Sequence, residues 1–287
     1  MQELFQTSFQ QGLLISLAVM GIYISFRILN FPDLTCDGSF SLGGGLAAVL
    51  LGASINPYLG FVIVLAAGFL AGTCTGILNS RFKINPLLAG ILMMTMLYSI
   101  NLRIMNRPNY PLLDFETILK PIENMGDYTQ IGMVAFFAIF VLFFKILIDL
   151  FLKTEMGLVL ISAGDNEKMT QGLGFNTSVV KIFGMGLSNA LIAASGALTA
   201  QYYGFADISM GIGIIIVGIA ALIIGESLFH PSRVSMHTLS LIFGTIIYYF
   251  IVSLGLRMGL APTDLKIATA LMVISVLIFR FKRAGNE

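Results

Sequence analysis

The sequence predicts an all-α protein that crosses a lipid bilayer eight or nine times. Of its 287 residues, 57% are hydrophobic and only 11% are charged, whereas about 25% of an ordinary soluble domain is charged. The mean hydropathy is +0.91. The formal net charge of +1 lacks the basic excess of a nucleic-acid-binding protein. These values exclude a soluble enzyme and a disordered chain, and they predict one transmembrane domain over residues 1–287.

Nine apolar stretches have roughly the length of a membrane-spanning helix, which needs about 20 residues to cross the hydrocarbon core. They cover residues 9–31, 40–56, 58–79, 85–102, 131–152, 180–203, 208–228, 236–254 and 265–281. The second stretch is short and rich in glycine, so it is predicted to be a broken or re-entrant helix. Irregular backbone at membrane depth must face protein or a water-filled path.

Small residues recur every fourth position in two of these stretches. They are Gly68, Gly72 and Gly76 in the third stretch, and Asn189, Ala193 and Ala197 in the sixth. Small residues at this spacing let two helices approach closely in a membrane. Both stripes are therefore predicted to be packing faces of a dense bundle.

The distribution of basic residues predicts the orientation. Arg27 is the first basic residue and lies near the end of the first apolar stretch rather than before it, while most Lys and Arg residues fall on the side that holds residues 153–179. The positive-inside rule then places the N-terminus outside and the C-terminus in the cytoplasm. A long hydrophilic loop, residues 103–130, falls outside, and another, residues 153–179, falls inside. Loops of this length are usually functional.

The sequence contains none of the common catalytic or nucleotide-binding motifs. It has no G-x-x-x-x-G-K-[ST], no G-x-S-x-G and no H-E-x-x-H. Its two cysteines are too few for a disulfide scaffold or a zinc site. We therefore predict no catalytic residue, no metal and no cofactor in this chain.

Residues 31–40 place two carboxylates between two apolar stretches. Asp33 and Asp37 lie there, and Pro32 and Gly38 are expected to break any helix. A buried carboxylate needs a partner, and Arg27 could supply one for either aspartate. One interpretation is a polar turn at the membrane surface. The other is a broken helix beside a translocation path.

Residues 205–211 resemble that segment, with an aromatic residue, an aspartate and small residues before an apolar stretch. The predicted topology puts the two segments on opposite faces of the membrane. Matching broken segments that face opposite ways indicate an inverted repeat around a central path. The candidate residues that line this path or support the broken helices are Asn30, Asp33, Asp37, Ser39, Asp207 and Met210. For the aspartates we favour support of the backbone over contact with a solute.

The inner loop reads as a short helix with marked ends. Asp165 or Asn166 can cap its N-terminus, and Gly172 or Gly174 can end it. A helix in this place suits a membrane subunit that receives force from a soluble partner, although a solvated loop without a partner would have the same pattern. The candidate coupling residues are Gly164, Asp165, Asn166, Glu167, Lys168, Met169, Gly172, Leu173 and Gly174.

Together these segments resemble a known family. Residues 10–13, 29–31 and 37–43 are similar to the first span and following region of permease subunits of bacterial ATP-binding-cassette importers, in the branched-chain amino acid and ribose permease superfamily. Asp37-Gly38-Ser39 stands where many branched-chain permeases have His-Gly-Glu, which argues against a branched-chain substrate. The chain looks closer to the subgroup assigned to aromatic amino acids, tryptophan and tyrosine, in residues 32–40, 164–166, 187–191, 195–198, 201–207 and 210–213.

The resemblance implies a bacterial inner-membrane complex surrounded by lipid, with no nucleic acid. It would contain two permease chains, often identical, and a dimer of cytoplasmic ATPases that binds ATP-Mg. An extracytoplasmic substrate-binding lipoprotein would deliver the ligand, and the inner loop would dock on the ATPase. The expected function is import of an amino acid, aromatic or not, or of a similar small polar solute by alternating access. The alternative is a secondary transporter driven by an ion gradient without an ATPase.

Overall fold

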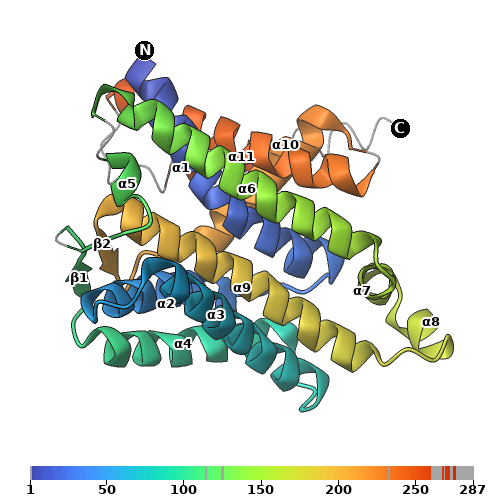
Figure 1. The fold of residues 1–287 in the computed structure, drawn as a ribbon. Coiled ribbons are helices and arrows are strands. Elements are labelled where there is room, and N and C mark those ends of the chain that lie inside the picture. Colours follow the sequence, from blue (N-terminus) through green and yellow to red (C-terminus); the bar gives the residue numbers. More distant parts are fainter. Residues whose placement is uncertain are drawn as a thin grey trace.

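The computed structural model describes residues 2–113, 115–123, 126–231, 233–259, 267, 269–271 and 274–275 (Figure 1). The first half contains α1 (Gln2–Ile22), the π-helical turn η1 (Tyr23–Ile28), α2 (Thr35–Gly52), α3 (Pro57–Ser80), α4 (Pro86–Met105), β1 (Asn109–Pro111), α5 (Lys120–Glu123), the 3-10 turn η2 (Gly126–Tyr128) and α6 (Thr129–Lys153). The second half contains α7 (Glu155–Asp165), α8 (Glu167–Gly172), α9 (Thr177–Tyr203), β2 (Phe205–Asp207), α10 (Ile214–Phe229) and α11 (Val234–Arg257). The predicted span 265–281 lies almost entirely outside the described residues.

Six of the described helices are long and apolar enough to cross a membrane. They are α1 with η1, α3, α4, α6, α9 and α11, and α10 is a shorter apolar helix. These helices confirm the predicted class, an all-α protein that crosses the membrane several times. The only strands among the described residues are β1 and β2, which form an antiparallel pair.

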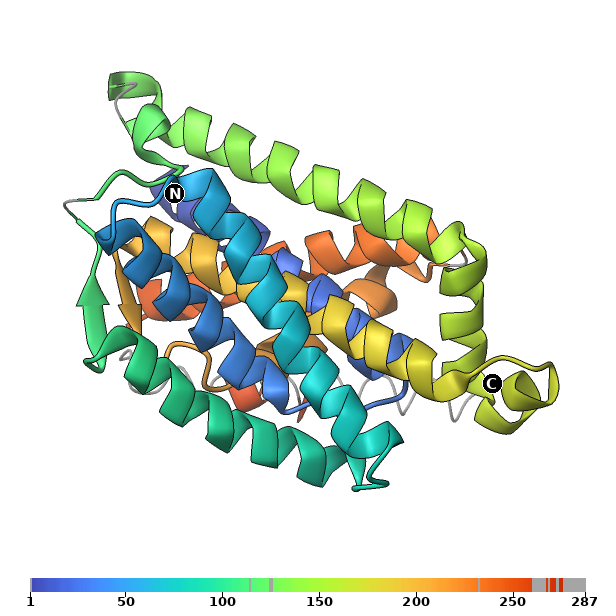
Figure 2. The same cartoon turned by 60° about the horizontal axis from the view of Figure 1, so that its bottom comes forward.

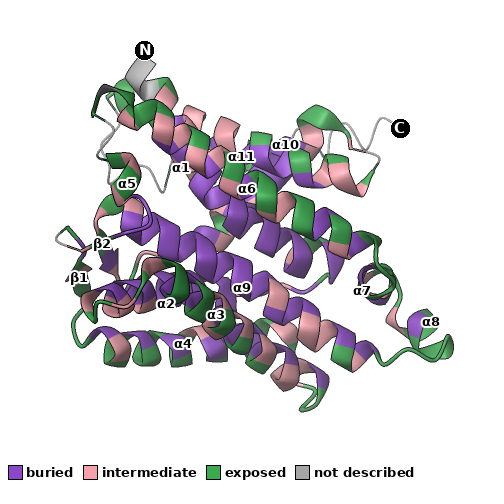
Figure 3. Cartoon of the chain, in the orientation of Figure 1, coloured by how far each residue is buried: buried purple, intermediate pink, exposed green. Residues whose placement is uncertain are grey.

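Two helices form the centre of the bundle. In α1 with η1 and in α9, 83% of the most apolar window is buried, against 28% in α4 and 22% in α6. Figure 3 shows this contrast over most of α9, in which exposed residues occur only near its two ends. α9 packs against α1, α2 and α3, and α1 packs against α6, α10 and α11. α4 and α6 lie at opposite edges (Figure 2), so they are the helices most open to lipid or to another chain.

The two stripes of small residues pack against each other, between α3 and α9. A Cβ atom added at Gly68 would lie 2.6 Å from the Cβ of Ala193, and one added at Gly72 would lie 2.1 Å from the carbonyl oxygen of Met185. Glycine lets the two backbones come this close, as expected for small residues in membrane helices. The stripes are thus packing faces, as the sequence predicts.

The two halves of the chain are arranged in a similar way. α1 and α9 run in opposite directions (Figure 1), and each is followed by a break in the helix and then by a shorter helix. α1 packs against α10 and α11 as α9 packs against α2 and α3. This exchange of partners is consistent with the predicted inverted repeat.

The two long hydrophilic loops lie at opposite ends of the bundle. The N-terminus and the β1–β2 pair lie at one end, and α7 and α8 lie at the other (Figure 1). The described parts of the loop 103–130 and the loop 153–179 therefore lie at opposite ends of the bundle.

Three local predictions were wrong. Gly38 does not break a helix, because it lies inside α2, and a Cβ atom there would be only 3.0 Å from the Cβ of Leu97 in α4. The second predicted span therefore begins at Thr35 rather than at residue 40. The seventh begins at Ile214 rather than at residue 208. The helix α7 and the two short strands were not predicted at all.

Candidate functional site

The first broken segment, residues 29–34, joins the end of η1 to the start of α2. Asn30 at its exposed apex has a left-handed backbone, with φ of 51°. Asp33 follows and is almost completely buried, with 1% of its surface exposed. Its Oδ1 atom accepts a hydrogen bond from the backbone N–H of Thr35 at 2.9 Å. A short polar side chain that accepts from the first turn of a helix is a typical N-terminal cap, so Asp33 starts α2.

Asp33 also ties this segment to the central helix α9. Its Oδ2 atom accepts from Nδ2 of Asn189 at 2.8 Å, and the thiol of Cys36 lies 3.6 Å from the same oxygen. No ion pair to Asp33 occurs within the described parts of the chain. A buried carboxylate is costly unless it is hydrogen-bonded, and here only neutral donors surround it. This geometry supports a structural role for Asp33.

Arg27 does not pair with either aspartate, contrary to the prediction. Its Nε atom donates to Oε1 of Glu226 in α10 at 3.0 Å. A second ionic contact joins Lys145 to Asp149 within α6 at 2.5 Å, and Asp149 also accepts from Thr238 of α11 at 2.6 Å. The Arg27 pair joins η1 to α10, and the hydrogen bond of Asp149 to Thr238 joins α6 to α11, so each carboxylate has a partner where an isolated charge would be unfavourable.

Asp37 links the two broken helices. It lies in the first turn of α2, yet its Oδ2 atom accepts from the backbone N–H of Gly213 at 2.9 Å and its Oδ1 atom from that of Ile215 at 3.2 Å. The hydroxyl of Ser41 accepts from the N–H of Gly211 at 3.0 Å. A carboxylate is favourable at a helix N-terminus, where backbone N–H groups lack partners and the dipole is positive. Asp37 thus caps α10 from α2.

The second broken segment, residues 204–213, lies at the other end of the bundle. Gly204, with φ of 74°, ends α9, and β2 then pairs with β1 of the outer loop. Asp207 accepts from the N–H of Ser209 at 2.8 Å and from Nδ2 of Asn109 at 3.3 Å, so it fixes the turn after β2. Met210 packs in the space left by Gly44, where a Cβ atom would lie 2.5 Å from the methionine sulfur.

The predicted residues thus separate into groups. Asp33 and Asp37 lie at the start of α2, and Asp207 has a separate set of partners at the β1–β2 pair. Ser39 is fully buried inside the bundle, and its hydroxyl has no hydrogen-bond partner within the described chain. It does not reach a surface of the single chain. Asn30 lies instead at the end of the bundle that carries α7 and α8, and its side chain contacts α7.

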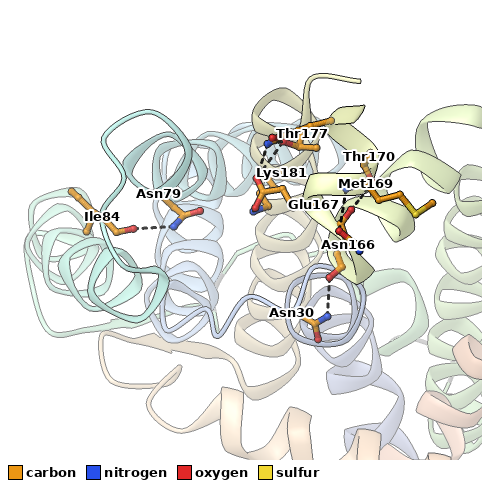
Figure 4. Close-up of polar contacts among 11 residues, drawn as sticks. Asn30, Asn79, Ile84, Asn166, Glu167, Met169, Thr170, Thr177 and Lys181 are labelled. Atoms are coloured by element: carbon orange, nitrogen blue, oxygen red, sulfur yellow. Dashed lines mark hydrogen bonds and ion pairs between the residues drawn. The ribbon is translucent and has the colours of Figure 1, made fainter. Parts of the chain in front are cut away.

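The inner loop consists of two short helices joined at one residue. Asn166 ends α7 and caps α8, because its Oδ1 atom accepts from the N–H of Met169 at 3.0 Å. Gly164 and Asp165 therefore belong to α7 and not to the predicted short helix. Glu167 anchors α8 to α9, since its carboxylate accepts from Nζ of Lys181 at 2.6 Å (Figure 4). This hydrogen bond lowers the pKa of the Glu167 carboxyl.

One face of α8 and its exit is apolar and exposed. Met169 is 59% exposed, Leu173 65% and Phe175 48%. Neighbouring apolar side chains that are exposed on a polar loop are typical of a surface that contacts another protein. Gly174, with φ of 90°, turns the chain after α8, whereas Gly172 is an ordinary helical residue. We call Met169, Leu173 and Phe175 the α8 patch.

Some site residues escaped the sequence prediction. Asn189 was assigned only to a packing stripe, although an amide inside an apolar stretch is itself a signal for a buried hydrogen bond. Glu226 carries a similar signal, a carboxylate inside the apolar stretch 208–228, but its partner Arg27 is 199 residues away and could not be named from the sequence. Among the described residues, no group of three or more His, Cys, Asp or Glu is placed to hold a metal ion.

Comparison with known proteins adds independent information. A family model described as "Branched-chain amino acid transport system / permease component" matches residues 5–279. A tyrosine transport system permease protein of Clostridioides difficile is 43% identical over 267 residues, which are 93% of this chain and 88% of that protein. An uncharacterized protein of Rickettsia prowazekii is 34% identical over 95% of this chain and 94% of its own.

More distant matches have the same kind of description. The ribose import permease protein of Escherichia coli K12 is 24% identical over 72% of this chain and 65% of its own. A solved structure described as an inward-facing ABC transporter of metal-chelate type superposes with a TM-score of 0.51 at 18% identity, over 96% of this chain and 85% of that one. At this identity the superposition concerns the fold alone.

Proposed function

Because the chain belongs to the family of branched-chain amino acid transport system permease components, it is the membrane permease subunit of an ABC importer, and we propose that it imports an aromatic amino acid into a bacterial cell. The family confirms the function class predicted from the sequence, and a permease of this kind is not itself an enzyme. The similar tyrosine transport permease supports an aromatic substrate. Proteins of this family work with ATPase and substrate-binding partners.

The observation that carries the proposed ATPase partnership is the α8 patch. A partner ATPase dimer binds ATP-Mg and hydrolyses it, and each ATPase receives the α8 patch of one permease. Met169, Leu173 and Phe175 supply the apolar contact, and the flanking charge of Lys168 is solvent-exposed beside them. Glu167 faces Lys181 instead, so it holds α8 in place rather than touching the partner. This chain needs no cofactor of its own.

A second, identical permease chain packs on the exposed face of α4. That face contains Thr95, Tyr98 and Ser99 among apolar residues. The exposed large side chains of α6 are mainly aliphatic and aromatic, which suits lipid. Polar groups in a membrane helix favour protein or a water-filled path over lipid. Two facing α4 helices therefore enclose the path for the substrate.

The path opens alternately to the two sides. The binding protein docks at the end that carries β1, β2 and the N-terminus, which faces outward, and the ATPases dock at the opposite, cytoplasmic end. ATP binding favours one of two arrangements of the broken helices. The size of this shift is set by the difference between the affinities of ATP for the complex in the two arrangements. Asp33, Asp37 and Asp207 keep the breaks in shape, and they do not bind the substrate directly.

The test is uptake of tritiated tyrosine by proteoliposomes that contain this chain with its ATPase and binding protein. We expect uptake only when ATP and the binding protein are both present. Unlabelled tryptophan should compete, whereas leucine and ribose should not. Uptake driven by a sodium or proton gradient through this chain alone would refute the proposal and favour the secondary transporter.

A variant of the α8 patch separates docking from membrane insertion. Leu173→Asp places a charge on the exposed patch without touching a membrane span, so it should reduce recovery of the ATPase with the permease. Lys120→Ala, in the outer loop, is the control and should leave recovery unchanged. Full recovery with Leu173→Asp would remove the α8 patch from the docking surface.

A further inference from the structure

The exposed asparagine at the apex of the first break joins that break to the cytoplasmic loop. Nδ2 of Asn30 donates a hydrogen bond to the carbonyl oxygen of Gly164 at 3.0 Å (Figure 4). Gly164 lies in the last turn of α7, where carbonyl groups lack partners within the helix. Asn30 therefore caps the C-terminal end of α7 from a segment that is far away in the sequence.

The fit at this point is tight and specific. A Cβ atom at Gly164 would lie 1.7 Å from the carbonyl oxygen of Ile28, so only glycine lets α7 come this close to the end of η1. Asn30 itself has φ of 51°, a conformation that asparagine and glycine tolerate better than other residues. The contact therefore requires a glycine at residue 164 and a residue that tolerates a left-handed backbone at residue 30, and the chain has both.

The contact lies between two elements with different roles. On one side, Gly164 is two residues from Asn166, which ends α7 and starts α8, so a displacement of α8 moves α7 directly. On the other side, the break leads into α2, and Asp37 in the first turn of α2 holds the N-terminus of α10. A continuous series of contacts therefore runs from the docking helix through both broken segments.

We infer that Asn30 is a positioning residue, through which movement of the docking helix α8 changes the arrangement of the two broken helices. The inference rests on the proposed ATPase partnership, because that partner is what moves α8. Coupling between distant sites needs an element that both sites bias, and the break at residues 29–34 is that element. Loss of the Asn30 hydrogen bond leaves α8 able to dock but unable to pull the break with it.

The test measures how accessible the second broken segment is to a thiol reagent, with and without nucleotide bound to the partner ATPase. In a Cys74→Ala background, Ile212→Cys places a thiol on an exposed residue beside Gly213, while the native Cys36 is buried. The permease–ATPase complex is assembled in lipid nanodiscs. The rate of maleimide labelling is measured without nucleotide and after trapping with ATP and vanadate. The parent protein should show different rates in the two states.

Asn30→Gly removes the amide but keeps a residue suited to the left-handed backbone. Asn30→Asp keeps the shape but replaces the donor with an acceptor. Both should shrink the ratio of the two labelling rates about fivefold, as expected when one ordinary hydrogen bond no longer biases a two-state equilibrium. ATPase recovery should stay at the parent value, and the melting temperature should fall by no more than the loss of one hydrogen bond allows, whereas a general folding defect would lower both.

Ser54→Gly is the matched control. Ser54 is also exposed and left-handed, with φ of 58°, but it lies in the turn between α2 and α3. If both Asn30 variants keep the ratio of the control, the inference is wrong while the proposed function stands. If the parent chain retains no ATPase, the proposed function itself is refuted, and the inference is refuted with it.

Discussion

The close approach of α3 and α9 can be tested with a single methyl group. Gly72→Ala puts a Cβ atom 2.1 Å from the backbone carbonyl oxygen of Met185 and 2.8 Å from the Cβ of Asn189. Ordinary contact would require α9 to retreat by about 1 Å, because a backbone oxygen cannot rotate away. Alanine gains about 1 kcal/mol in helix propensity over glycine. Overpacking of a tight core costs about 1–3 kcal/mol, so the net effect should be destabilising.

Gly60→Ala in the same helix is the comparison. It adds the same methyl group, but the nearest atom would be the Cβ of Leu50 at 3.7 Å, which is ordinary contact. The two variants therefore share the gain in propensity and differ only in the clash. Thermal unfolding in detergent, followed by fluorescent labelling of the buried Cys36 thiol in a Cys74→Ala background, measures the difference. We expect Gly72→Ala to melt several degrees below the parent protein and Gly60→Ala to melt at or above it.

Equal melting temperatures for Gly72→Ala and Gly60→Ala would refute the reasoning, because they would mean that α3 and α9 have space between them. The same result would remove the argument that the stripe of glycines on α3 is a packing face. A fall in both variants would point to a different cause, the loss of flexibility in α3.

Three further predictions concern sidedness, the docking helix and pH. A cysteine at Leu113, which is 80% exposed in the outer loop, should react with an impermeant reagent in intact cells, whereas one at Lys168 should react only after the membrane is opened. Gly174→Val should reduce ATPase recovery, since a left-handed backbone costs a non-glycine residue about 1–2 kcal/mol, but Gly172→Val should not, because its backbone is helical and no atom lies within 4 Å of an added Cβ. The Lys181 contact lowers the pKa of Glu167, so its stabilisation of α8 is complete above the usual pKa of about 4.3 and is lost as the pH falls through the lowered value. The protection of α8 amides, measured as exchange relative to unstructured peptide at the same pH, should therefore fall there, and Glu167→Gln should abolish this dependence.

The membrane spans could be predicted because their signal is local. An apolar run such as residues 131–152 needs no distant partner to be recognised, and α6 covers Thr129–Lys153. The cap of α8 was also predictable, since Asn166 needs only the next three residues to accept its hydrogen bond. Alternative caps at Asp165 and Asn166 could not be separated from the pattern alone.

The failures all involve distant contacts. Gly38 appears to be a helix breaker until α4 is placed beside it, and only then does its small size make sense. Arg27 had two nearby carboxylates in the sequence, yet it binds Glu226, which is 199 residues away. β1 and β2 are three residues each, and neither would form a strand without the other. The role of Asn30 likewise depends on Gly164, on the far side of α6.

The burial of α9 also affects how the protein is made. The most apolar 18 residues of α9 have a mean hydropathy of 1.4, against 2.7 in α6, and its polar side chains include Ser188, Asn189, Ser195 and Gln201. As it leaves the ribosome, α9 is therefore a poor candidate for release into lipid on its own, while α6 enters readily. α1 is synthesised long before α9, and its partner face stays uncovered until then. Assembly of the core must wait for the second half of the chain, and a protein truncated before residue 177 is expected to be a substrate for membrane proteases.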